Sequence, residues 1–211
     1  MPQSFSAFFS QILQNPALAA VVLLTLAVVL VNGWTDAPNA IASVVVTGAL
    51  PFRPAVFMAA VCNFLGVLCL VSVNASVAET VNSIASFGGG TRDALTALCA
   101  AMAAVVLWAA AAWLFGLPTS ESHALVAGVS GAAVALNGGL SCIRWESWGK
   151  VLLGLLLASA AGFWAGRSVG NSLKSVKWNN RIFLLAQLPG AAGTGFLHGA
   201  QDGQIFLGIF L

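Results

Sequence analysis

The sequence alternates between long apolar stretches and short polar segments along almost its whole length. A helix needs about 20 apolar residues to cross the roughly 30 Å of hydrocarbon in a bilayer. Five stretches approach this length: Ala17–Val31, Ala55–Val73, Ala94–Phe115, Val151–Gly170 and Ile182–Phe196. Shorter apolar stretches are Ala37–Leu50, Ala124–Leu136 and the terminal Ile205–Leu211. This pattern predicts an all-α polytopic transmembrane helical bundle.

Composition narrows the class further. Of the 211 residues, 59% are hydrophobic and 7% are charged, and the mean hydropathy is +0.95. Soluble domains carry about 25% charged residues, so this composition excludes a soluble globular protein. Intrinsic disorder is excluded because it requires low hydrophobicity and high charge. Eight basic and six acidic residues leave a net charge of +2. A net charge this small gives no basic surface for nucleic acid, so we expect no nucleic-acid partner. The high hydrophobicity predicts that the chain lies in a lipid bilayer.

Basic residues gather at one link between apolar stretches. Arg167, Lys174, Lys177 and Arg181 are half of the eight positive charges. The positive-inside rule therefore predicts that the link 171–181 is cytoplasmic. Met1–Pro16 contains no Lys or Arg, so we expect the first apolar stretch to be retained as a membrane segment and not cleaved as a signal.

Three polar clusters interrupt the apolar stretches, and polar groups at bilayer depth usually mark a functional site. They are Asn32–Ala40, Leu117–His123 and His198–Gln204. In the first cluster, Gly33 permits unusual backbone angles and Pro38 suits the first turn of a new helix. In the second, Thr119 or Ser120 suits a helix N-cap. We expect discontinuous helices with breaks at Gly33–Pro38, Leu117–His123 and His198–Gly203.

The first and third clusters share a pattern. Asn32-Gly33-x-x-Asp36 recurs as His198-Gly199-x-x-Asp202, 166 residues later. Matching interruptions in two halves indicate a transport site between structural repeats. We expect residues 1–170 to form a first transmembrane repeat, 171–181 a basic linker, and 182–211 the start of a second. Because a helix that ends within hydrocarbon leaves its last carbonyl groups unsatisfied, we expect a fragment or one half of a split protein.

Ordinary structural roles compete with functional ones at several of these residues. Asp36 could serve only as a buried N-cap, Glu121 as a helix-start carboxylate and His123 as a core histidine. Ser120 and His123 also permit a nucleophile–base pair. No nucleophile elbow or zinc motif accompanies that pair, so we expect no enzyme and no cofactor.

At these residues the sequence resembles the inorganic phosphate transporter family of cation-coupled phosphate symporters. The resemblance rests on Gly33–Ala40 with Thr47–Leu50, on Pro118–Val126 and on His198–Gln204, in the family's order. It implies two inverted halves, of which this chain holds the first and the start of the second. The sequence departs from the family at Trp34, Thr35, Glu121 and Gln201.

If phosphate is the substrate, its oxygens need donors, which hydroxyl groups and helix N-termini provide. We expect Thr119, Ser120, Ser122 and Asn39 to bind phosphate. Ionised carboxylates only accept hydrogen bonds and would repel the anion. We therefore expect Asp36, Asn39 and Asp202 to bind a coupling cation. Supporting roles are expected for Glu121, His123, His198, Gln201 and Gln204.

Several alternatives stay open on the sequence alone. The coupling cation is Na⁺ or H⁺, and the anion is phosphate or another oxyanion such as sulfate. The chain could also be a non-transporting half-subunit that needs a partner chain, or it could form a homo-oligomer. The absence of a cleavable signal and of a long hydrophilic domain favours a bacterial inner membrane.

Overall fold

The computed structural model describes residues 5–36, 38–71, 76–88, 90–174 and 179–209. These residues are helical almost throughout, and within them β structure amounts to one isolated bridge, Ala85 to Ile143. The elements are α1 (Phe5–Gln14), α2 (Pro16–Thr35), α3 (Pro38–Val46), α4 (Phe52–Val71), α5 (Ser76–Asn82), α6 (Thr91–Leu114), α7 (Glu121–Asn137), η1 (Leu140–Cys142), α8 (Trp145–Lys174) and α9 (Asn180–Leu207). The all-α prediction is confirmed.

Polar caps set where several helices begin. The side chain of Asn15 accepts hydrogen bonds from the amides of Ala17 and Leu18 at 3.1 and 3.2 Å. Pro16 follows it at the first helical position, where the missing N–H costs no hydrogen bond. Ser120 caps α7 and Asn179 caps α9 in the same way. The sequence predicted a cap at Thr119 or Ser120, and the structure shows that Ser120 is the cap.

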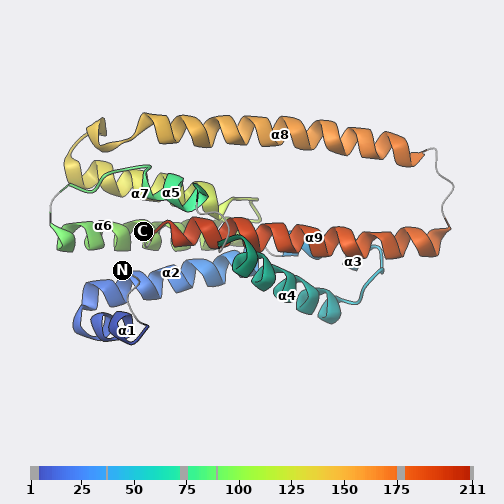
Figure 1. The fold of residues 1–211 in the computed structure, drawn as a ribbon, viewed down its shortest axis with the longest axis horizontal. Coiled ribbons are helices and arrows are strands. Elements are labelled where there is room, and N and C mark those ends of the chain that lie inside the picture. The colour runs from blue at the N-terminus through green and yellow to red at the C-terminus, as the bar shows by residue number, and fades with distance from the viewer. Residues whose placement is uncertain (1–4, 37, 72–75, 89, 175–178, 210–211) are drawn as a thin grey trace.

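The helices pack into two connected groups (Figure 1). In the first, α6 packs against α2 and α7, and Val28, Met102 and Leu125 are buried between these helices. In the second, α9 packs against α4 and α3, around buried Val44 and Ala191. The C-terminal half of α9 also reaches α5 and adds Ile205 to the first core. Helix α9 therefore connects both groups, and its polar residues lie where the groups meet.

Two of the three predicted helix breaks are confirmed. Helix α2 ends at Thr35 and α3 begins at Pro38; Ala37 lies outside the described residues. Helix α6 ends at Leu114 and α7 begins at Glu121. Gly116, with φ of +64°, supplies the left-handed turn between them.

The third predicted break is wrong, because α9 runs without interruption through His198–Gly203. The glycines there serve helix packing instead of a chain turn. A Cβ atom at Gly199 would collide with the backbone of Asn63, and one at Gly203 would lie 2.9 Å from the side chain of Val67. Gly195 continues this row at four-residue spacing. Small residues at this spacing let two membrane helices approach closely, and here they bring α9 against α4.

Within the described residues, four helical stretches are long and apolar enough to cross a membrane: Pro16–Val46, Phe52–Leu70, Thr91–Leu114 and Trp145–Lys174. They cover four of the five predicted spans. The fifth, Ile182–Phe196, lies in α9, whose 28 residues include several polar side chains. The chain is thus a multi-pass membrane protein.

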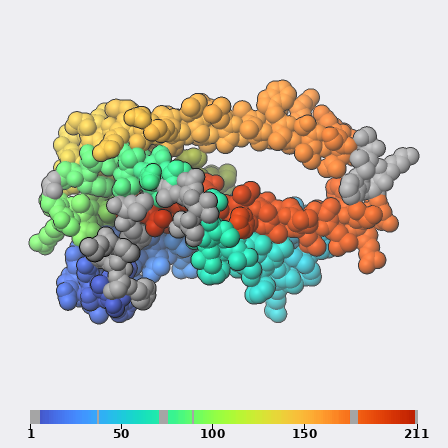
Figure 2. All heavy atoms as spheres, viewed as in Figure 1, coloured from blue at the N-terminus to red at the C-terminus, as the bar shows by residue number. Residues whose placement is uncertain are grey.

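Helix α8 stands apart from the rest of the molecule over most of its length. Its 30 residues span about 45 Å at 1.5 Å per residue, and only Ser147, near its start, is buried. Figure 2 shows the open space between α8 and α9. Helix α8 reaches Lys174 and α9 begins at Asn180, so the expected linker 171–181 overlaps both helix ends. The division into repeats stays a prediction.

Candidate functional site

Asp36 stands at the junction of two half-helices. It is the C-cap of α2, and its amide donates to the carbonyl oxygen of Asn32 at 2.9 Å. Asn39, in the first turn of α3, donates from Nδ2 to Asp36 Oδ1 at 3.1 Å. The first polar cluster thus brings two expected cation ligands, Asp36 and Asn39, into contact.

Asp202 comes to the same place from α9 and has two partners there. Asn32 Nδ2 donates to Asp202 Oδ2 at 2.6 Å, and His198 Nε2 lies 3.3 Å from the same oxygen. His198 and Asp202 are four residues apart and share a face of α9. The side chain of Asp202 is 16% exposed. The matching Asn/His–Gly–x–x–Asp patterns of the sequence therefore meet in space, through Asn32 and Asp202.

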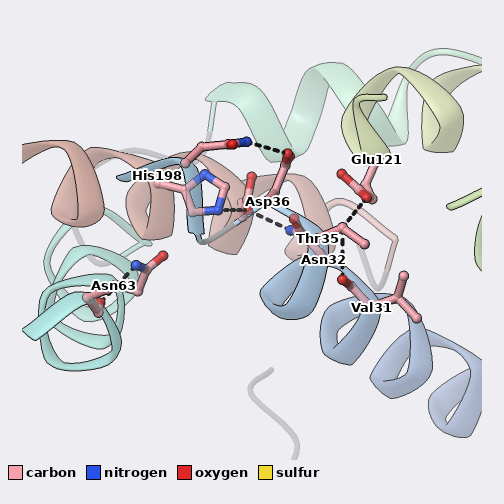
Figure 3. A network of polar contacts seen from close by, with 10 residues as sticks. Val31, Asn32, Thr35, Asp36, Asn63, Glu121 and His198 are labelled. Atoms are coloured by element: carbon pink, nitrogen blue, oxygen red, sulfur yellow. Dashed lines mark hydrogen bonds and ion pairs between the residues drawn. The ribbon is translucent and has the colours of Figure 1, made fainter. Parts of the chain in front are cut away.

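Glu121 contributes a third carboxyl group from the start of α7. It is 2% exposed, and Thr35 Oγ1 donates to its Oε1 at 2.6 Å. The same Thr35 hydroxyl lies 2.9 Å from the carbonyl oxygen of Val31. Glu121 Oε2 has no hydrogen-bond partner. Figure 3 shows Glu121, Thr35 and Asp36 close together, with His198 on the other side of Asp36.

The four ionisable groups act on one another. Asp36 interacts electrostatically with Glu121, Asp202 and His198, and Asp202 interacts with His198 and Glu121. No Lys or Arg is among the described groups that act on either aspartate. We call Asp36, Glu121 and Asp202 the acidic cluster.

Two cavities lie beside the acidic cluster. The first, of about 630 Å³, is mostly apolar, with Asn32, Asn63, His198 and Asp202 as its polar lining. The second, of about 490 Å³, is more polar and is lined by Ser122 and His123 of α7, Gln201 of α9, Lys150 of α8 and Thr80 of α5, among others. Neighbouring residues of α9, Gln201 and Asp202, therefore face different cavities.

The structure separates the residues expected to bind the anion. Ser122, His123 and Gln201 line the second cavity together. Thr119 instead accepts a hydrogen bond from Trp108 Nε1 at 2.7 Å on the exposed side of α6. Ser120 accepts a weak bond from the His123 amide at 3.5 Å as a helix cap. Asn39 lies with Asp36. Gln204 is 3% exposed, and its Oε1 has no partner.

Sequence reasoning missed three polar residues at this site. The sequence marks Asn32 only as part of the repeated pattern and Thr35 only as a departure from the family, yet in the structure both donate hydrogen bonds to carboxylates. Asn63 lines the first cavity from α4, and its Nδ2 donates to the Ala59 carbonyl at 2.9 Å. Asn63 is an isolated amide within the apolar stretch Ala55–Val73, a signal that could have marked it.

Within the described parts of the chain, no three His, Cys, Asp or Glu side chains are grouped as they would be around a metal ion. Carboxylate, amide and hydroxyl oxygens dominate the site, and such ligands suit hard cations.

Comparisons with known proteins agree with the resemblance seen in the sequence. The profile of the phosphate transporter family matches residues 32–181. A probable low-affinity inorganic phosphate transporter of Streptomyces halstedii is 38% identical over 183 residues, which cover 81% of this chain and 80% of the relative. A relative of the same description from Bacillus subtilis is 31% identical over 195 residues, covering 90% of this chain and 57% of the relative.

A third relative, the low-affinity inorganic phosphate transporter PitA of Escherichia coli K12, is 31% identical over 226 aligned positions, covering 90% of this chain and 45% of the relative. The chain thus spans about half the length of most of these curated relatives. No solved structure matches. The relatives are named as transporters, in agreement with the expectation that the chain is not an enzyme. From its polar clusters, its helical membrane fold and these matches, the chain belongs to the phosphate transporter family.

Proposed function

We propose that this chain forms part of a cation-coupled symporter of inorganic phosphate in a bacterial cell membrane. The observation that carries the proposal is the meeting of carboxyl groups from α2, α7 and α9 beside a cavity lined by hydrogen-bond donors. The names of the relatives support phosphate as the anion. Most of these relatives are longer, so the complete transport cycle is proposed for the whole protein.

The second cavity is the proposed phosphate site. Phosphate carries between one and two negative charges near neutral pH, and its oxygens accept hydrogen bonds. Ser122, His123 and Gln201 offer donors to one space. Thr119, Ser120 and Asn39 have other partners, so we give Ser122 the main role among the expected hydroxyl donors.

The acidic cluster is the proposed cation site, with Asp36, Asn39 and Asp202 as ligands. At about 4 Å, two like unit charges repel by about 4 kcal/mol at an effective dielectric of roughly 20. Carboxylates next to a phosphate site therefore weaken anion binding unless a cation neutralises them. Because Gln201 and Asp202 are neighbours on α9, the two sites are close enough to couple in this way. Phosphate affinity then depends on the bound cation, which is a linkage free energy.

Phosphate uptake by proteoliposomes containing the purified chain tests the proposal. Sodium is replaced by potassium in one series, and the pH gradient is varied in another. Uptake that depends on sodium or on the proton gradient, and that excess sulfate does not inhibit, supports phosphate symport. Phosphate uptake that is independent of both ions, or sulfate uptake of equal rate, overturns it.

A half-subunit that needs a partner chain is the second candidate. The favouring observation is that the chain covers 45–57% of three of its relatives, while residues 152–174 of α8 are exposed along their length. Light scattering of the detergent-solubilised chain measures its oligomeric state. A homo-oligomer active in uptake favours symport by the chain alone. An inserted, inactive monomer favours the half-subunit.

A further inference from the structure

The α2 end of the acidic cluster has more oxygen acceptors than donors. Glu121 Oε2 and Asn32 Oδ1 are both buried and have no hydrogen-bond partner. The orientation of Asn32 is set by the bond from its Nδ2 to Asp202, so it is the oxygen of this amide that has no partner. The single Thr35 hydroxyl proton faces two acceptors, Glu121 Oε1 and the Val31 carbonyl. A buried acceptor without a hydrogen-bond partner destabilises the folded state. A positively charged ligand bound to this group of oxygens would remove that cost.

The three carboxyl groups differ in how well they are satisfied. Asp202 has both His198 and Asn32 as partners. Among the described residues, the amide of Asn39 is the one side chain that donates a hydrogen bond to Asp36. The Glu121 carboxyl group interacts with Asp36, and two ionised carboxylates cannot donate hydrogen bonds to each other. The unbalanced negative charge is therefore centred on the pair Asp36 and Glu121.

The backbone adds to this preference for a cation. Asn32, Thr35 and Asp36 lie at positions i, i+3 and i+4, so they share one face of the last turn of α2. The C-terminal end of a helix carries a partial negative charge. Discontinuous membrane helices use such ends, together with side-chain oxygens, to coordinate sodium.

We propose that Glu121 is a ligand of the coupling cation and that this cation is a sodium ion held by Asp36, Glu121 Oε2 and Asn32 Oδ1 at the end of α2. The inference rests on the proposed cation-coupled function and specifies its ion and its ligands. It moves the centre of the cation site from the pair Asp36 and Asp202 to the pair Asp36 and Glu121. Asp202 then serves mainly to position Asn32.

Glu121, at the start of α7, and Thr35, at the end of α2, contact each other directly. Thr35 orients the carboxyl group of Glu121 so that its second oxygen is left free of hydrogen bonds. Ser122 and His123, which follow Glu121 directly in α7, line the proposed phosphate cavity. A cation on Glu121 is thus adjacent in sequence to the anion site.

Sodium binding to the purified chain, measured without phosphate, tests this assignment. Thermal unfolding is followed as sodium chloride replaces potassium chloride at constant ionic strength, because a ligand that binds only the folded state stabilises it in a concentration-dependent way. Glu121→Gln preserves the acceptor for Thr35 but removes the charge. We expect it to raise the sodium concentration for half-maximal stabilisation at least tenfold. The same substitution at exposed Glu146, which pairs with Lys150 at 2.9 Å, should leave that concentration unchanged.

An unchanged sodium dependence in Glu121→Gln would overturn the proposal. So would a wild-type chain that responds to pH but not to sodium, since the pair would then hold a proton. If Glu121→Gln does not fold, Glu121→Asp replaces it, and weakened sodium binding in that shorter acid supports the assignment. Because phosphate is absent from this assay, failure here leaves proposed phosphate transport standing, and failure of phosphate uptake leaves the sodium result valid.

Discussion

At the scale of single residues, neutral polar side chains contact each of the three carboxyl groups in the interior. Asn32 and Thr35 contact carboxylates from α9 and α7, and Asn39 contacts Asp36. Three neutral side chains at the α2–α3 junction thus donate hydrogen bonds to the three carboxyl groups of the acidic cluster. Among the described residues, no Lys or Arg acts on Asp36 or Asp202, and carboxylates gathered in a low-dielectric interior are costly unless a cation binds there.

Replacing Asp36 with Asn should abolish cation-dependent phosphate uptake. The substitution removes the charge but keeps an oxygen that can accept from Asn39, so membrane insertion should be unaffected. Uptake by proteoliposomes and the amount of inserted protein are measured together. Normal coupled uptake by the inserted variant would contradict the role given to Asp36.

Replacing Ser122 with Ala should raise the apparent KM for phosphate several-fold, with little change in the cation concentration needed for half-maximal uptake. Ser122 lines the proposed phosphate cavity, where its hydroxyl group can donate a hydrogen bond to the anion. Thr119→Ala is the matched control, because Thr119 faces Trp108. Equal effects of the two substitutions on KM would argue against the second cavity as the anion site.

The Asn32–Asp202 hydrogen bond should contribute measurably to stability. Polar contacts between membrane helices contribute on average about 0.6 and at most about 1.7 kcal/mol. Asn32→Ala should therefore lower the free energy of unfolding by an amount in this range. Asn63→Ala is the control, since that amide bonds only to Ala59 in its own helix. Chemical unfolding in detergent compares them, and a larger loss in Asn63→Ala would contradict this reading.

At the scale of elements, the sequence predicted most helices but not the role of the glycines in α9. The breaks after α2 and α6 were predictable, because Gly, Pro and a Ser cap mark them locally. The break expected at His198–Gly203 was wrong, because the function of Gly199 depends on α4, which is distant in sequence. The partners of Asp202 and Glu121 were unpredictable for the same reason.

The close approach of α4 and α9 predicts which glycines tolerate a methyl group. Gly199→Ala should strongly destabilise the chain, because the new Cβ would collide with the backbone of Asn63. Gly195→Ala is the matched control on the same helix face, since its Cβ would make an ordinary contact at 3.5 Å. Melting temperatures in detergent compare them. Equal melting temperatures would show that the helices are not so closely packed.

At the scale of the whole molecule, helices α8 and α9 run along the long axis with open space between them over much of their length (Figures 1 and 2). The adjoining ends of the two helices carry the concentration of basic residues seen in the sequence, with Arg167 and Lys174 in α8 and Arg181 in α9. The side of the membrane on which these helix ends lie therefore fixes the orientation of the chain.

A single cysteine at Asn180, in a background without the four native cysteines, should be labelled from the cytoplasmic side only. The positive-inside rule places the link 171–181 there. A membrane-impermeant thiol reagent is applied to intact cells and to inside-out vesicles. Labelling of intact cells would reverse the predicted orientation.

The central claim is that a cation site at the acidic cluster and a phosphate site in the second cavity are energetically coupled. The most direct test measures both binding constants on the purified chain. Phosphate affinity is measured with and without sodium, and sodium affinity with and without phosphate. Linkage requires that each ligand strengthen the other by the same factor, and coupling free energies of 1–3 kcal/mol correspond to about 5–150-fold. We predict a mutual increase in that range, lost in Asp36→Asn. Phosphate binding of equal strength with and without sodium would contradict the account.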